Sequence, residues 1–219
     1  MNLKGKTAIF LGDSITEGAG TSCEENRYYN ILKRRCELNE VVGYGVGGTR
    51  IAIQSKPSEV ESFDRHFSLR ADEMQKNADI VVVFGGTNDY GHGDAPLGEF
   101  SDRTPYTFYG ACHELFQKLI NKYSESTIVV VTPLHRVDEM NLRGEGFKQT
   151  EVAPLSVYVD IIKEEARNYS LPVCDLYANS GMQPNIPIIK EKYIPDGLHP
   201  NDKGNEIIAD RLRSFLINL

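Results

Sequence analysis

A serine and a histidine stand near opposite ends of the chain, each among turn-forming residues. Ser14 follows an apolar run, and Gly12 permits a sharp turn before it. Pro200 disfavours helical geometry at His199, so the imidazole is expected to project from a loop. Asp196 could accept a hydrogen bond from one ring nitrogen and leave the other to take a proton from a serine. These residue types suit a nucleophile, a base and an orienting acid.

Each of these segments also has an interpretation without catalysis. The hydroxyl of Ser14 or Thr16 could cap the next helix, and residues 12–18 could bind a phosphate, as the equivalent loop does in flavin-binding α/β proteins. A histidine such as His199, taken alone, is more often structural or simply exposed. The acid at position 196 is the feature that favours chemistry at His199.

A glycine-rich segment follows a second apolar run. Gly43, Gly45 and Gly48 match the dinucleotide pattern G-x-G-x-x-G, but that pattern belongs after the first strand with a helix directly behind it. Here Pro57 and its polar neighbours interrupt any long helix. We expect instead that these small residues bring backbone N–H groups close to a reacting carbonyl.

Asn88 and Asp89 follow the most apolar run of the chain. Asn88 could be a turn residue for local reasons. Its amide is also a neutral donor that could stabilise an oxyanion. We expect Asp89 to brace the loop rather than to react.

These residues require elements that bring them together, and the sequence predicts a parallel sheet. Short β-branched runs alternate with segments of helical period, which is typical of α/β proteins. The predicted strands are 7–11, 41–44, 79–84, 127–132 and 171–174. Ligands bind outside the carboxyl ends of such strands. Three of the predicted strands are followed by the segments described above, and the fourth is followed by residues 135–136, so four of the five ends carry a candidate motif.

Helices are predicted where apolar residues recur with helical spacing. The predicted helices are 26–38, 104–123, 152–169 and 202–217. Residues 55–77 are mixed in character. Residues 134–150 and 178–195 have little periodicity and many Gly, Pro or charged residues, so we expect long loops there.

Length and charge limit the classes of function. The 219 residues suit one domain over 1–219, and a net charge of −7 disfavours binding to nucleic acid or anionic lipid. No apolar run approaches the roughly 18 residues that a spanning helix needs, so stable membrane association is not expected. The first residues lack the pattern of a signal peptide, which predicts a cytoplasmic protein. The oligomeric state has no signal in the sequence.

The cysteines give no sign of a metal site or of disulfides, because they are widely spaced and form no C-x-x-C pair. We expect buried free thiols. No clustered metal ligands are visible, and no metal or organic cofactor is expected.

Together, four segments make the chain resemble the SGNH (GDSL) hydrolases. The matching blocks are Gly12-Asp13-Ser14, Gly45-Val46-Gly47-Gly48, Gly86-Thr87-Asn88-Asp89 and Asp196-Gly197-Leu198-His199. All four occur in order. The resemblance implies a three-layer α/β/α, flavodoxin-like sandwich with a five-stranded parallel sheet. It also implies Ser14 as nucleophile, His199 as general base and Asp196 as its orienting acid.

The resemblance further implies an oxyanion hole. Its donors would be the backbone N–H groups of Ser14 and Gly48 and the side chain of Asn88. The family often has a polar residue where this chain has Gly47, so Gly47 stays an alternative to Gly48. Tyr44 stands where many members carry asparagine.

We therefore expect hydrolysis of carboxylic esters through an acyl-enzyme. Residues 134–150 are polar, which favours short-chain acyl or O-acetyl esters, such as those of carbohydrates, over lipid aggregates. Asp13, Tyr90, His135 and Arg136 are expected pocket residues. Alternatives are an acyltransferase with the same site, a lysophospholipase or thioesterase, and, more remotely, a flavin- or phosphate-binding module without catalysis.

Overall fold

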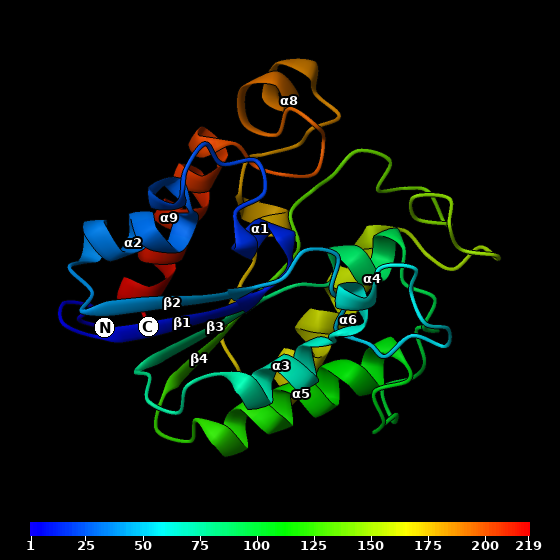
Figure 1. The fold of residues 1–219 in the computed structure, drawn as a ribbon, viewed down its shortest axis with the longest axis horizontal. Helices are drawn as coiled ribbons and strands as arrows, with labels where there is room; N and C mark the ends of the chain where they lie inside the picture. The colour runs from blue at the N-terminus through cyan, green and yellow to red at the C-terminus, as the bar shows by residue number, and fades with distance from the viewer.

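A computed structural model describes residues 1–219, and its centre is one parallel sheet with strand order β2-β1-β3-β4-β5 (Figure 1). The strands are β1 (Thr7–Gly12), β2 (Glu40–Gly45), β3 (Ile80–Phe84), β4 (Thr127–Val131) and β5 (Val173–Cys174). This order is that of flavodoxin-like sheets. The predicted fold class is confirmed, and each predicted strand is present within one or two residues.

Four longer helices correspond to the four that the sequence predicts. They are α2 (Tyr28–Cys36), α5 (Phe108–Lys122), α6 (Leu155–Asn168) and α9 (Asp202–Ile217). The short helices are α1 (Ser14–Glu17), α3 (Phe67–Glu73), α4 (Thr87–Gly91), α7 (Leu176–Asn179) and α8 (Pro187–Tyr193), with 3-10 turns η1 (Glu24–Asn26) and η2 (Glu61–Asp64). Helix α5 begins later than expected because the Thr107 hydroxyl accepts the Gly110 N–H at 3.1 Å and caps it there.

The expectation of a continuous loop over residues 178–195 is wrong, because α8 lies within it. Pro187 stands at the first helical position, where its fixed φ favours helix initiation. None of the residues of α8 is buried, so the segment has no apolar stripe for a sequence pattern to reveal. Residues 134–150 contain neither helix nor strand, as expected.

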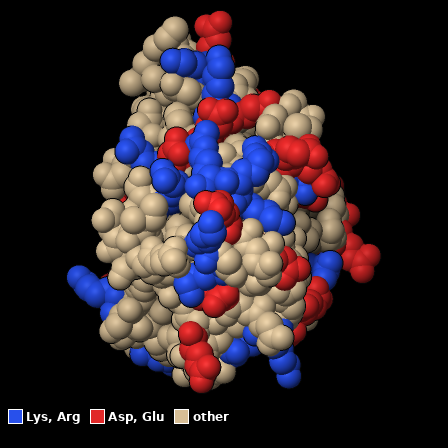
Figure 2. Space-filling model, turned by 90° about the vertical axis from the view of Figure 1, so that its left-hand side faces the viewer, with Lys and Arg blue, Asp and Glu red and all other residues tan.

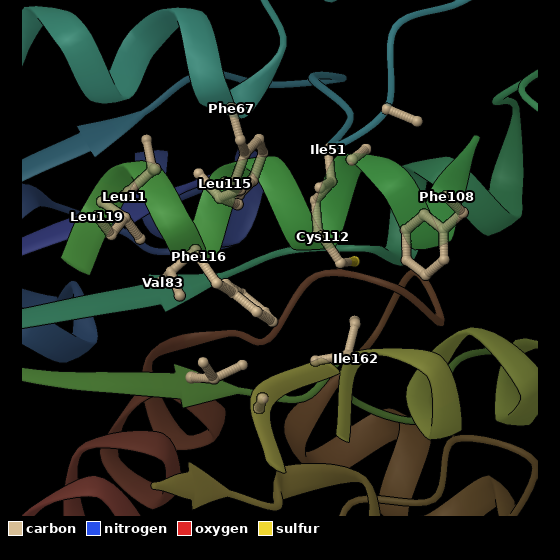
Figure 3. Close-up of a cluster of buried hydrophobic side chains, with 14 of the residues drawn as sticks. Leu11, Ile51, Phe67, Val83, Phe108, Cys112, Leu115, Phe116, Leu119 and Ile162 are labelled. Carbon is tan, nitrogen blue, oxygen red and sulfur yellow. The ribbon is translucent and has the colours of Figure 1, made fainter. Parts of the chain in front are cut away.

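The sheet separates two apolar cores. Leu11 lies in one core with Phe67 of α3, Leu115 of α5 and Ile162 of α6 (Figure 3), and Ile9 belongs to the same core. Their neighbours Ala8 and Phe10 face α2 and α9, because successive side chains of a strand point to opposite faces. The segment before α9 therefore reaches the carboxyl ends of the strands from one face of the sheet. The segment before α3 reaches them from the other face.

The surface carries charges of both signs. Seen from the side of the chain termini, a group of basic side chains lies near the centre, with acidic side chains mainly above, below and to its right (Figure 2). Arg35 bonds Asp210 at 2.5 Å, and Lys4 bonds Glu37 at 2.7 Å. Exposed pairs of this kind contribute little to stability. None of the helices is long and apolar enough to cross a membrane.

All four cysteines are free, but only two match the expectation of buried thiols. Cys112 and Cys174 are buried, Cys36 is half-buried and Cys23 is exposed. Cys112 points into the core between α5 and the sheet (Figure 3). Cys23 lies just before η1, which has no buried residue, so no apolar pattern there predicts its environment.

Candidate active site

Ser14, His199 and Asp196 form a continuous hydrogen-bonded chain, although Ser14 and His199 are 185 positions apart. Ser14 Oγ lies 2.9 Å from His199 Nε2, and His199 Nδ1 lies 2.7 Å from Asp196 Oδ2. Ser14 is the first residue of α1, which sits at the carboxyl end of β1 (Figure 1). The three residues have the relative arrangement of a nucleophile, a base and an orienting acid.

Local bonds fix the acid in this chain. Asp196 Oδ1 accepts the backbone N–H groups of Leu198 at 2.8 Å and His199 at 2.7 Å. Partial burial would raise the pKa of Asp196, but these two bonds and the imidazole lower it on balance, so the carboxylate stays ionised. The Gly197 carbonyl accepts the Val137 N–H at 2.9 Å, which holds the turn against the segment after β4.

The turn that presents Ser14 depends on residues with little space around them. A Cβ at Gly12 would lie 1.9 Å from Thr16 Oγ1, so only glycine fits. Asp13 is buried, and its carboxylate accepts the Ile15 N–H at 3.0 Å and caps α1. The Thr16 hydroxyl bonds the Tyr28 hydroxyl at 3.0 Å. The cap is therefore Asp13, and neither Ser14 nor Thr16 has that role.

Gly47 and Gly48 differ in what their N–H groups do. The Gly47 N–H donates to Glu17 Oε2 at 2.9 Å. The N–H groups of Gly48 and Ser14 donate to no group of the chain. Gly48 has φ +72°, a conformation that favours glycine. Of the two glycines, Gly48 is thus the one with a free donor.

Asn88 lies in the first turn of α4 and is 4% exposed. Its Nδ2 donates to the Thr49 carbonyl at 3.0 Å, which places the amide beside the residue that follows Gly48. An amide nitrogen carries two hydrogens, so one remains for a ligand. Asp89 accepts the N–H groups of Ile51 and Ala52, both at 2.9 Å, and the expectation that it braces the loop is confirmed.

Arg70, which no sequence pattern indicates, is a buried residue that supports the site through hydrogen bonds to its loops. Arg70 is 2% exposed and donates to the carbonyls of Gly12 at 2.9 Å and Tyr44 at 2.7 Å, and to the Thr49 hydroxyl at 2.8 Å. It thereby joins the ends of β1 and β2 to the loop beside Asn88. Burial lowers the pKa of Arg70 to about 10, which leaves it charged at neutral pH.

The expected pocket residues have mostly bracing contacts. Tyr90 is buried and donates to the Asp138 carbonyl, and Asp13 is the buried cap of α1. The buried Arg136 bonds the Thr87 carbonyl at 3.2 Å. These three side chains do not form an accessible wall, because their polar groups are directed at the protein.

His135 is more accessible than the other three expected pocket residues, with 22% of its side chain exposed. Its Nδ1 lies 2.9 Å from the Glu139 carboxylate, and its ring packs on the ring of Tyr177 of α7, with ring centroids 3.9 Å apart and an interplanar angle of 33°. These contacts direct His135 toward the β5 edge of the sheet.

No cluster of three or more His, Cys, Asp or Glu side chains has the geometry of a metal site. The glycines of the G-x-G-x-x-G match are used for close packing: a Cβ at Gly45 would lie 2.1 Å from the Glu17 nitrogen, and one at Gly43 2.6 Å from the Tyr29 ring. What the site offers is a bonded Ser–His–Asp chain beside free N–H donors.

These features agree with the family to which the sequence can be matched. The model of the GDSL-like lipase/acylhydrolase family matches residues 10–207. The chain therefore belongs to the GDSL-like lipase/acylhydrolase family and is a hydrolase that acts on esters. No curated protein matches the chain in sequence.

Solved structures share the fold over nearly the whole chain. A protein from Lactobacillus plantarum is 29% identical, with TM-score 0.82 over 98% of each chain. The acetyl xylan esterase AlAXEase is 24% identical, with TM-score 0.64 over 95% of this chain and 98% of its own. A two-domain esterase active on acetylated mannans is 21% identical, with TM-score 0.63 over 99% of this chain and 50% of its own. At their identities, the two esterases show the fold alone.

Proposed function

We propose that the protein is a serine esterase that hydrolyses short-chain acyl or O-acetyl esters through an acyl-enzyme. The observation that carries the proposal is the bonded chain from Ser14 Oγ through His199 to Asp196, with distances of 2.9 Å and 2.7 Å. Ester hydrolysis by a serine needs a base within hydrogen-bond reach and an acid that fixes the imidazole tautomer. This arrangement supplies both.

In the proposed reaction, Ser14 Oγ attacks the carbonyl carbon while its proton passes to His199 Nε2. The tetrahedral intermediate collapses, the bond to the alcohol oxygen breaks, and His199 returns the proton to that oxygen. Water then attacks the acyl group on Ser14, again with His199 as base, and releases the acid. Asp196 stays ionised throughout and stabilises the imidazolium.

The negative charge that develops on the carbonyl oxygen needs donors that are already in place. The free N–H groups of Ser14 and Gly48 and the remaining amide hydrogen of Asn88 are suited to this task. Glu17 supports the arrangement, because it takes up the Gly47 N–H and so fixes the peptide next to Gly48.

The sequence of residues 134–150 is rich in charged residues, which favours a small or polar substrate, although Met140, Leu142 and Phe147 of this loop are exposed. Esterases of acetylated xylan and acetylated mannan share this fold, which makes O-acetylated carbohydrate the first substrate to test. No metal or cofactor is needed for the proposed steps.

Product analysis tests the proposal. With an acetylated xylose ester as substrate, we expect free acetate to equal the alcohol released, also when other sugar hydroxyls are present as acceptors. The Ser14→Ala protein, purified in parallel, measures any contaminating esterase. Transfer of acetate to an acceptor would identify an acyltransferase instead, and equal turnover by Ser14→Ala would exclude Ser14 as the nucleophile.

A further inference from the structure

One aromatic ring lies directly against a proposed oxyanion donor, and a second ring packs next to the first. Phe63, from η2, lies against Gly48: a Cβ at Gly48 would be 2.1 Å from Cε1 of the Phe63 ring. The ring edge thus fills the space where a side chain at position 48 would lie. The ring of His92 packs next to that of Phe63, with centroids 5.4 Å apart and an interplanar angle of 33°.

The second ring, that of His92, is linked through its backbone to Asn88, another proposed donor. His92 follows α4, and its backbone N–H donates to the Asn88 carbonyl at 3.0 Å. Arg50 Nη1 lies 3.3 Å from His92 Nδ1, and Arg50 is itself held by Asp64 at 2.7 Å. The two rings are therefore fixed relative to Gly48 and Asn88.

The pair is also neutral. Burial and the neighbouring Arg50 guanidinium lower the pKa of His92 to about 4, so its ring is uncharged at neutral pH. Both residues are half-buried. A neutral aromatic surface beside the oxyanion donors is suited to contact with hydrocarbon and not with a charged group.

The geometry of the reaction decides which part of a substrate meets this surface. In the tetrahedral intermediate the alcohol oxygen must face His199 Nε2, and the oxyanion must face the donors. The acyl substituent takes the remaining direction. His199 stands just before α9, which packs on the α2/α9 face, whereas Phe63 stands just before α3, which packs on the opposite face of the sheet. An acyl substituent directed away from His199 would therefore meet Phe63 and His92.

From this placement we propose that Phe63 and His92 form the wall of the acyl site and restrict the enzyme to acetyl and other short acyl groups. This inference rests on the proposed function and names the residues that set its acyl specificity. His92 also lines a hollow of about 550 Å³, in which the apolar residues Ala95, Leu97 and Phe147 stand among charged ones such as Lys56 and Glu151. Removal of the His92 ring would widen this hollow, and removal of the Phe63 ring would free the space beside Gly48, so each change would make room for a longer chain.

The test measures kcat/KM for p-nitrophenyl acetate, butyrate, hexanoate and octanoate with wild type, Phe63→Ala and His92→Ala. Because a closed hydrophobic pocket discriminates about 10- to 200-fold per methylene, we expect the wild-type value for octanoate to be at least about tenfold below that for acetate. In each variant the octanoate-to-acetate ratio should rise by about tenfold or more. Val60→Ala, a change at an exposed residue just before η2, is the matched control and should keep the wild-type ratio.

Phe63→Leu is included because it keeps an apolar side chain against Gly48 if Phe63→Ala fails to fold. It should shift the ratio in the same direction, by less. Ratios unchanged in both His92→Ala and Phe63→Leu, with Ser14→Ala inactive, would overturn the wall and leave the proposed function intact. Turnover in Ser14→Ala would instead overturn the proposed function itself.

Discussion

In the proposed mechanism, each amide hydrogen of Asn88 has a separate role. One amide hydrogen bonds the Thr49 carbonyl at 3.0 Å, and the other is available to an oxyanion beside the free Gly48 N–H. A turn residue would need only the first of these. Because an oxyanion exists only after the serine has attacked, the second hydrogen should act in the transition state and contribute little to substrate binding.

We therefore expect Asn88→Ala to lower kcat by about 10² to 10³, or roughly 2.7 to 4 kcal/mol, with a modest change in KM. Kinetics and the melting temperature should be measured on the same preparation. A nearly normal kcat with a lower melting temperature would show that Asn88 only braces the loop, and would leave Ser14 and Gly48 as the donors.

At the scale of elements, α1 is a four-residue helix whose position depends on one buried carboxylate. Burial raises the pKa of Asp13 to about 6, although its bond to Ile15 and the charge of Arg70 oppose the change. The folded state therefore binds the Asp13 proton more tightly than the unfolded state does. This contribution to stability is complete at pH values below about 4, where Asp13 is protonated even in the unfolded chain, and is lost as the pH rises through about 6.

Asp13→Asn should remove this pH dependence, because asparagine can cap α1 in the same way without a charge. The relevant quantity is the difference in unfolding free energy between variant and wild type. A shift of about 2 pKa units corresponds to about 3 kcal/mol. The unfolding free energy of Asp13→Asn, relative to that of wild type, should therefore rise by an amount of that order from pH 4 to pH 7.5. Denaturant unfolding at both pH values measures it. An equal difference at the two pH values would contradict the assignment.

The elements themselves were largely predictable. Strands such as β3 are continuous apolar runs, which buried central strands require, and α9 has a clear apolar stripe. Helix α8 was not predictable because it buries none of its residues. Ser14, His199 and Asp196 could be proposed as a group because four segments, in order, resemble the SGNH (GDSL) hydrolases.

The supporting contacts of the site could not be found in this way. Arg70 bonds the Gly12 carbonyl 58 positions away, and Glu17 bonds the Gly47 N–H 30 positions away. Phe63 fills the space beside Gly48 from a segment with no regular pattern. Such contacts depend on how strands and loops are arranged in space, and no spacing along the chain encodes them.

At the scale of the whole molecule, the sheet brings the parts of the site together from both of its faces. Ser14 stands after β1, Gly48 and Asn88 follow β2 and β3, and His199 stands just before α9. Phe63 stands in η2, just before α3 on the other face. In the proposed mechanism, this arrangement would place the alcohol and the acyl group of a substrate on opposite sides of Ser14.

The central claim is that Ser14 is the nucleophile, and covalent labelling tests it most directly. A fluorophosphonate reacts with an activated serine, with loss of fluoride, and leaves a stable adduct that peptide mass spectrometry can locate. We expect one adduct per chain, on the peptide that contains Ser14, with a loss of esterase activity in proportion to labelling, and no adduct in folded Ser14→Ala. Labelling at another residue, or full esterase activity in the labelled protein, would contradict the account.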